Sequence, residues 1–175
     1  MTYTSSLYAR GDLTVRVRSV ASGRTLRTFV MRNTITYLGM GTVVQLLSQR
    51  IAPLDDAPIS LKLAELWVGD SAVPPVRSDT TLAMGPPGYR DQLTLTDATK
   101  TPNIAGPIYE LRLLATLPSI TPANGGLPLA EAGLYTAGSL VPAVPQRLFA
   151  RQIHPLINKT SAIVIDYDWR ISFTA

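Results

Sequence analysis

The chain of 175 residues contains no cysteine and a single histidine, His154. The absence of cysteine excludes disulfides, thiolate metal sites and cysteine nucleophiles. One histidine excludes a metal centre built on a histidine pair and leaves one candidate for histidine-dependent catalysis. The proline after His154 predicts an exposed or locally hydrogen-bonded ring at a strand end, and no serine has a G-x-S-x-G setting. A hydrolase is therefore disfavoured, and we expect no catalytic residue, cofactor or metal site.

Long apolar segments are also missing, although 46% of the residues are hydrophobic. The longest runs, such as LAELWV and ELRLLATL, fall far short of the ~20 residues that cross a bilayer as a helix. The first residues, MTYTSSLYARGDL, lack the basic start and apolar core of a secretory signal. We therefore expect one globular domain over residues 1–175, without a membrane span or a signal peptide.

Acidic residues are scarce near the N-terminus. Residues 1–50 hold seven arginines and one acid, whereas residues 51–175 hold nine basic and eleven acidic residues. The arginines alternate with apolar residues, as on the solvated face of a half-buried sheet. They would also suit a phosphate-binding surface or a basic pole that meets a neighbouring subunit. Because they have little aromatic interleaving and no known nucleic-acid motif, a protein partner is favoured over nucleic acid. The interface candidates in this region are Arg16, Arg18, Arg24, Arg27 and Arg32.

The hydrophobic pattern is mainly that of strands. DLTVRVRSV and LRTFVMRN, separated by SGRT, predict an Arg-rich hairpin within residues 1–32. Apolar residues at three-to-four spacing in TYLGMGTVVQLLSQRI predict one helix near residues 36–51. The alternation in AIVIDYDWRISFTA predicts a long strand, whose outward Asp166 and Asp168 would repel one another unless arginines lie opposite them. Without β-α-β alternation, this order of elements predicts a single-domain antiparallel β-sandwich with one helix.

Two Pro-rich loops are expected, over residues 71–90 and 136–147. Long irregular connections of this kind are uncommon in compact domains and often serve binding or assembly. Arg77 and Tyr89 in the first loop are therefore further interface candidates. If Trp67, Tyr89 and Tyr135 were exposed and clustered, they would instead indicate a carbohydrate-binding or receptor-binding module.

One carboxylate, Glu131, lies inside the apolar stretch LAEAGLY. It has no second acid or histidine near it in sequence, as acid–base chemistry would require. We predict a structural turn, in which Glu131 accepts backbone N–H groups or pairs with Arg151 or Arg112. Gly133 would supply either a positive φ or a close backbone approach.

Several segments together resemble small virion proteins of tailed bacteriophages over residues ~32–173. They are RNTITYLGMGTVVQLLSQ, AELWVGDSAVPPVRSDTTL, LAEAGLYTA and LFARQIHPLINKTSAIVIDYDWRISF. The EAGL ending is loosely similar to the N-terminal attachment domains of phage tail-fibre proteins. The chain departs from this pattern in its Arg-rich hairpin and in its Pro-rich insertions at 84–88 and 141–145.

The resemblance implies a non-enzymatic structural subunit of a virion at a tail, neck, baseplate or capsid-surface position. Such a subunit is made in the host cytoplasm, and its partners are copies of itself and other virion proteins. It would pack through its N-terminal hairpin and its Pro-rich loops. The alternative is a carbohydrate-binding or receptor-binding β-sandwich module of a tail fibre, whose partner would be a host-surface glycan.

Overall fold

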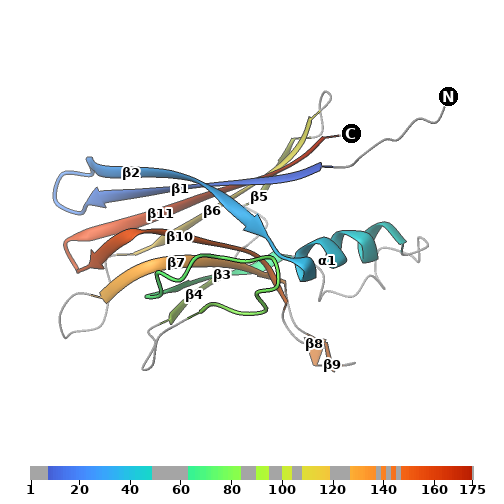
Figure 1. Ribbon diagram of the computed structural model, residues 1–175. Helices are drawn as coiled ribbons and strands as arrows, with labels where there is room; N and C mark the ends of the chain where they lie inside the picture. Colours follow the sequence, from blue (N-terminus) through green and yellow to red (C-terminus); the bar gives the residue numbers. More distant parts are fainter. Residues whose placement is uncertain are drawn as a thin grey trace.

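The protein is mainly β, with one short helix at one end of its sheet (Figure 1). The computed structural model describes residues 8–48, 63–83, 90–94, 100–103, 108–118, 127–136, 139–140, 143–144 and 147–174. In chain order the elements are β1 (Tyr8–Ser19), β2 (Thr25–Ile35), α1 (Tyr37–Ser48), β3 (Leu63–Gly69), β4 (Arg90–Thr94), β5 (Lys100–Asn103), β6 (Ile108–Leu117), β7 (Leu127–Thr136), β8 (Ser139–Leu140), β9 (Ala143–Val144), β10 (Leu148–Lys159) and β11 (Ile163–Thr174).

The main sheet contains nine strands in the order β4-β3-β7-β10-β2-β1-β11-β6-β5, and its pairings are antiparallel. Its two halves meet between β2 and β10, where only Ile35 pairs with Ala150 and Thr34 with Arg151. At its ends the sheet curls round until β4 contacts β6, so that it is nearly closed into a barrel. The predicted sandwich is not confirmed, because this one continuous sheet encloses the core.

The core follows the alternation that the sequence predicts. Inward side chains of β1, β6 and β11 are almost fully buried, and they pack with apolar residues of β3, β7 and β10. Trp169 and Tyr167 are the largest apolar side chains at its centre. Burial of such side chains contributes about 1.5 to 3 kcal/mol each, which makes this core the main source of stability. The central inward residues are Leu13, Val15, Val17, Leu113, Ala115, Leu117, Ile165, Tyr167, Trp169 and Ile171.

The predicted helix forms and begins at Tyr37. Thr36 caps it, because its hydroxyl oxygen accepts a hydrogen bond from the Gly39 N–H at 3.0 Å. The backbone N–H of Thr36 donates to the Phe149 carbonyl on β10 at 3.0 Å, which attaches the helix start to the sheet. Residues 49–51 of the predicted helix lie outside the described residues. No helix in the described part of the chain is long and apolar enough to span a membrane.

Residues 70–83, which include the described part of the Pro-rich loop predicted over 71–90, lie against β7 and β10 (Figure 1). Leu82 is buried there, and its N–H donates to the Tyr135 hydroxyl at 2.9 Å. Residues 129–136 of β7 are consequently buried along their whole length. In the second predicted loop, residues 136–147, the short strands β8 and β9 pair with each other. The first loop therefore covers its own sheet instead of projecting from it.

Candidate functional site

Glu131 lies in the interior of β7 and is fully buried. Its Oε2 accepts hydrogen bonds from the Arg151 guanidinium at 2.9 Å and from the Ala83 N–H at 3.1 Å. Arg151, also fully buried, donates to Asp79 Oδ2 and to the Val73 carbonyl, both at 2.9 Å. The sequence prediction placed Glu131 at a turn, but here β7 continues between β3 and β10. The predicted pairing with Arg151 is observed, and it fixes loop 70–83 to the sheet.

Gly133 also lies inside β7 and not at a turn. A Cβ at this position would lie 2.7 Å from Leu82 Cδ2 and 2.9 Å from Leu148 Cδ1. Among the described glycines, only Gly23 has a positive φ. Of the two predicted reasons for a glycine at 133, the structure therefore supports close approach.

Two of the five hairpin arginines predicted as interface candidates form ion pairs with carboxylates of β11. Arg16 on β1 donates to Asp168 Oδ2 at 3.2 Å, and Arg18 donates to Asp166 Oδ1 at 2.8 Å. Arg112 on β6 completes the arrangement with hydrogen bonds to Asp168 at 2.7 and 2.8 Å. The arginines that Asp166 and Asp168 need opposite them are therefore present, and they come from β1 and β6. We call Arg16, Arg18, Arg112, Asp166 and Asp168 the arginine ladder.

The ladder changes the acidity of its carboxyl groups. Burial alone would raise the pKa of Asp168, but the hydrogen bonds and charge of Arg112, with Arg16 and Arg170 beside it, lower the pKa overall. Burial likewise opposes the effect of Arg18 and Thr116 on Asp166, and the pKa of Asp166 is also lowered. Both groups are therefore ionised at neutral pH, and their charge is satisfied within the molecule.

The other three interface candidates in the hairpin, Arg24, Arg27 and Arg32, are exposed. Within the described residues, none of the three has an ion-pair partner. Exposed apolar side chains lie among them: Leu26 is 57% exposed and Val30 is 71% exposed. The second half of the hairpin therefore presents basic and apolar groups together.

The backbone of β2 is open along one side. Over residues 25–33, β2 pairs with β1 alone among the described strands, because β10 meets it only at Thr34 and Ile35. Figure 1 shows β1 and β2 side by side, with the turn that joins them at the end of the hairpin far from the helix. Unpaired N–H and C=O groups along such an edge can pair with a strand of another chain. Arg24, Arg27, Arg32, Leu26 and Val30 lie on or beside this segment, which we call the hairpin edge.

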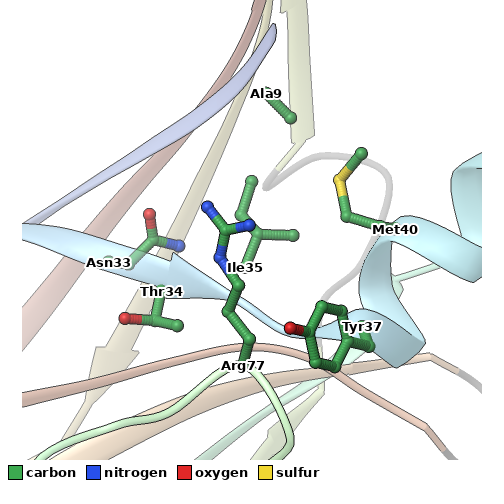
Figure 2. A pocket seen from close by; sticks show the side chains of 7 residues that line it. All are labelled: Ala9, Asn33, Thr34, Ile35, Tyr37, Met40 and Arg77. Carbon is green, nitrogen blue, oxygen red and sulfur yellow. The ribbon is translucent and has the colours of Figure 1, made fainter.

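Arg77 projects from loop 70–83 into a hollow of about 430 Å³ beside the start of α1 (Figure 2). Its backbone carbonyl accepts a hydrogen bond from the Tyr37 N–H at 2.8 Å, which joins the loop to the helix. Its guanidinium has no ion-pair partner among the residues that the structure places. Tyr89, the other loop candidate, lies outside the described residues. The hollow is lined by Ala9, Asn33, Thr34, Ile35, Tyr37, Met40 and Arg77.

Asn33 also lines this hollow, but it was not identified from the sequence as a candidate site residue. Neither its Nδ2 nor its Oδ1 is exposed, and neither has a hydrogen-bond partner in the described part of the protein. Its side chain lies over Gly11, where a Cβ would be only 1.5 Å from Asn33 Oδ1. The available signal was an asparagine on the inward face of an apolar strand, since asparagine is depleted in strands.

His154 lies inside β10 and not at a strand end, and it is only 5% exposed. Its Nδ1 lies 2.9 Å from the Pro155 carbonyl oxygen, which agrees with the predicted local hydrogen bond. Burial lowers the pKa of His154, and this hydrogen bond opposes the effect only in part. Within the described ranges, no group of three His, Asp or Glu side chains is arranged to hold a metal ion.

Two of the three aromatic residues considered for sugar binding, the partly buried Trp67 and the buried Tyr135, pack against each other. The rings of Trp67 and Tyr135 lie 5.4 Å apart and are tilted by 46°. Tyr135 is only 6% exposed, and its hydroxyl contacts loop 70–83 through Leu82 and Thr81. This pair is therefore part of the packing beneath the loop, and it does not offer an open stacking surface for a sugar.

The comparisons with known proteins give no relative: no protein-family model, curated protein or solved structure matches the chain.

Proposed function

We propose that the protein is a non-enzymatic structural subunit of a tailed-bacteriophage virion, which packs against copies of itself or against other virion proteins. Its position would be a tail, neck, baseplate or capsid-surface site. The virion assignment rests on the resemblance of the sequence segments. The observation that carries an assembly role is the hairpin edge, where an unpaired strand side coincides with exposed Val30 and with arginines that have no partner in the described part of the fold.

The contrast between paired and unpaired arginines supports this proposal. In the ladder, Arg16 and Arg18 meet carboxylates of their own chain. Arg27 and Arg32 have no such partner in the described residues, so acidic groups of another chain can approach them without breaking an internal pair. Complementary charge steers association and fixes register, and strand pairing along the edge would add backbone hydrogen bonds.

The burial of the acid–base candidates supports a non-enzymatic role. Glu131 is fully buried, and its charge is balanced by Arg151. His154 is buried against Tyr167, with their ring centres 5.9 Å apart. Neither group can reach a substrate without local unfolding. The first Pro-rich loop contributes less to the proposal than the hairpin, because residues 70–83 are fixed to their own sheet.

The test is light scattering of the purified protein over a range of salt concentrations. We expect a discrete oligomer that dissociates as salt screens the arginines. The double variant Arg27→Gln/Arg32→Gln should reduce association at low salt. The matched control, Arg10→Gln/Arg170→Gln, removes the same charge from arginines that lie beside Asp12 and Asp168, and it should leave association unchanged.

A monomer at every salt concentration would contradict self-association through the hairpin edge. The edge arginines would then serve to prevent pairing with strands of other chains. The virion assignment has its own test, which is mass spectrometry of purified particles of the phage that encodes the chain. A fixed copy number per particle is expected, and absence from the particles would overturn the assignment. Binding on a glycan array by the monomer would favour the tail-fibre β-sandwich module instead.

A further inference from the structure

The hollow at the end of the sheet has the dimensions of a binding site for a small group. It lies between the end of β2, the first turn of α1 and Arg77 of loop 70–83 (Figure 2). Its volume of about 430 Å³ lies within the range of roughly 300 to 1,000 Å³ that is usual for ligand pockets. The residues that build it come from β1 (Ala9), from the continuous segment 33–40 and from the loop (Arg77), and the hydrogen bond from the Tyr37 N–H to the Arg77 carbonyl joins the last two.

One side of the hollow is rich in hydrogen-bond donors. Figure 2 shows the Arg77 guanidinium between Asn33 and Tyr37. The Asn33 amide is buried and has no partner in the described residues, which is costly unless a ligand or water satisfies it. Among the described residues, none that lines the hollow is acidic. The site therefore favours an anionic group.

The rest of the lining is apolar. Ile35 is buried, and Met40 and Ala9 extend the same wall. A planar carboxylate matches the fork of a single guanidinium and can accept a further bond from the Asn33 amide. A single arginine would balance only part of the charge of a phosphate dianion. An aliphatic group attached to the carboxylate would cover the apolar wall.

We propose that this hollow binds a carboxylate carried on an aliphatic body, with Arg77 and Asn33 holding the carboxylate and Ile35 and Met40 contacting the body. Two sources present this chemistry: a small free carboxylic acid, and the C-terminal residue of a polypeptide. The hollow uses Asn33 and the residues that follow it, at the α1 end of β2, whereas Arg27 and Val30 lie nearer the hairpin turn. Its test and the light-scattering test can therefore fail independently.

The test is a titration of the isotopically labelled full chain followed by NMR, with N-acetyl-leucine as the probe and N-acetyl-leucinamide as its neutral counterpart. We expect saturable shifts at Asn33, Tyr37 and Arg77, and an affinity for the acid about tenfold above that for the amide. An acetylated tetrapeptide ending in leucine distinguishes the sources. If the tetrapeptide binds more tightly than N-acetyl-leucine, the natural ligand is a polypeptide terminus. If the two bind equally, it is a small acid. Equal affinities for the acid and amide, or shifts remote from the hollow, would overturn the proposal.

Variants make the test specific to the hollow. Arg77→Gln should lower the affinity for N-acetyl-leucine about tenfold, to that of the amide, because Arg77 supplies the charge. Arg170→Gln is the matched control, since Arg170 is exposed on β11 and does not line the hollow. Inorganic phosphate should not displace N-acetyl-leucine at equal concentration. Displacement by phosphate, or unchanged binding in Arg77→Gln, would contradict carboxylate recognition by this arginine.

Discussion

The two strands of the N-terminal hairpin carry similar alternating patterns, yet their arginines have different surroundings. On β1, Arg16 and Arg18 lie next to β11 and form ion pairs with Asp168 and Asp166. On β2, Arg27 and Arg32 lie along an edge that no described strand covers over residues 25–33. The difference arises from the neighbouring strand and not from the hairpin itself. An arginine-rich strand therefore stabilises the fold or remains available to a partner according to its place in the sheet.

The largest expected loss of stability comes from breaking the ion pair of Arg151, which lies outside the hairpin and is fully buried among its partners. Glu131→Ala would leave the buried Arg151 guanidinium with Asp79 as its remaining carboxylate partner in the described residues. Breaking a buried pair from one side costs about 3 to 5 kcal/mol, and we expect a loss of this order in the free energy of unfolding. Urea denaturation followed by tryptophan fluorescence measures it.

The double variant Glu131→Leu/Arg151→Met is the control for this prediction. It removes both charges together and should recover part of the lost stability, since no buried charge is left without its partner. A denaturation midpoint for Glu131→Ala equal to that of the parent protein would show that the pair does not stabilise the fold.

An intermediate effect is expected in the ladder. Asp168→Asn removes the charge shared by Arg16 and Arg112, and we expect a loss of about 1 to 2 kcal/mol because these arginines are partly solvated. Asp12→Asn, which removes the partner of Arg10 at the surface, should cost less than about 0.5 kcal/mol. Equal losses in the two variants, measured by urea denaturation, would contradict a special role for the ladder.

Lowering the pH should reduce the stability of the fold in two stages. The pKa of His154 is lowered by burial, so the folded state binds fewer protons than the unfolded state, and stability falls as the pH drops below about 6.5. The pKa values of Asp166 and Asp168 are also lowered, so the stability from their ion pairs is present above about pH 4 and is lost below it. His154→Leu should remove the first stage and keep the second. Thermal unfolding across pH measures both, and an unchanged first stage would assign it to another group.

The smallest effect on folding is expected at the hairpin edge. Arg27→Gln/Arg32→Gln should change the free energy of unfolding of the monomer by less than about 0.5 kcal/mol, because neither side chain has an internal ion pair in the described residues. Urea denaturation at a salt concentration that keeps the protein monomeric measures this change. A loss as large as that of Asp168→Asn would mean that these arginines have structural partners of their own.

Alternation and spacing were sufficient to predict the hairpin, the helix and the long strand β11, because these features depend on local periodicity. They did not predict the single curled sheet, since its two halves are joined by only two long-range pairs, Ile35 with Ala150 and Thr34 with Arg151. The turn expected at Glu131 was wrong for a related reason. The acid and the glycine that indicate a turn locally are there to accommodate Arg151 and Leu82, which come from distant parts of the chain.

The sequence did not predict the hollow. It selected one of the lining residues, Arg77, and only as an interface candidate in a Pro-rich loop. Asn33 and Tyr37 are recognised as lining residues only in the structure, where the end of β2 and the start of α1 lie beside this loop. Periodicity cannot predict such a meeting of segments, because each residue by itself has an ordinary local role.

Hydrogen–deuterium exchange of the backbone amides of residues 25–33 tests most directly whether subunits join along the hairpin edge. It is measured on the oligomer at low salt and on the dissociated protein at high salt, with the amides of β1 as the internal reference. We expect the β2 amides that are not bonded to β1 to exchange rapidly in the monomer and to become protected in the oligomer. An oligomer whose β2 amides exchange as rapidly as those of the monomer would contradict assembly through this edge.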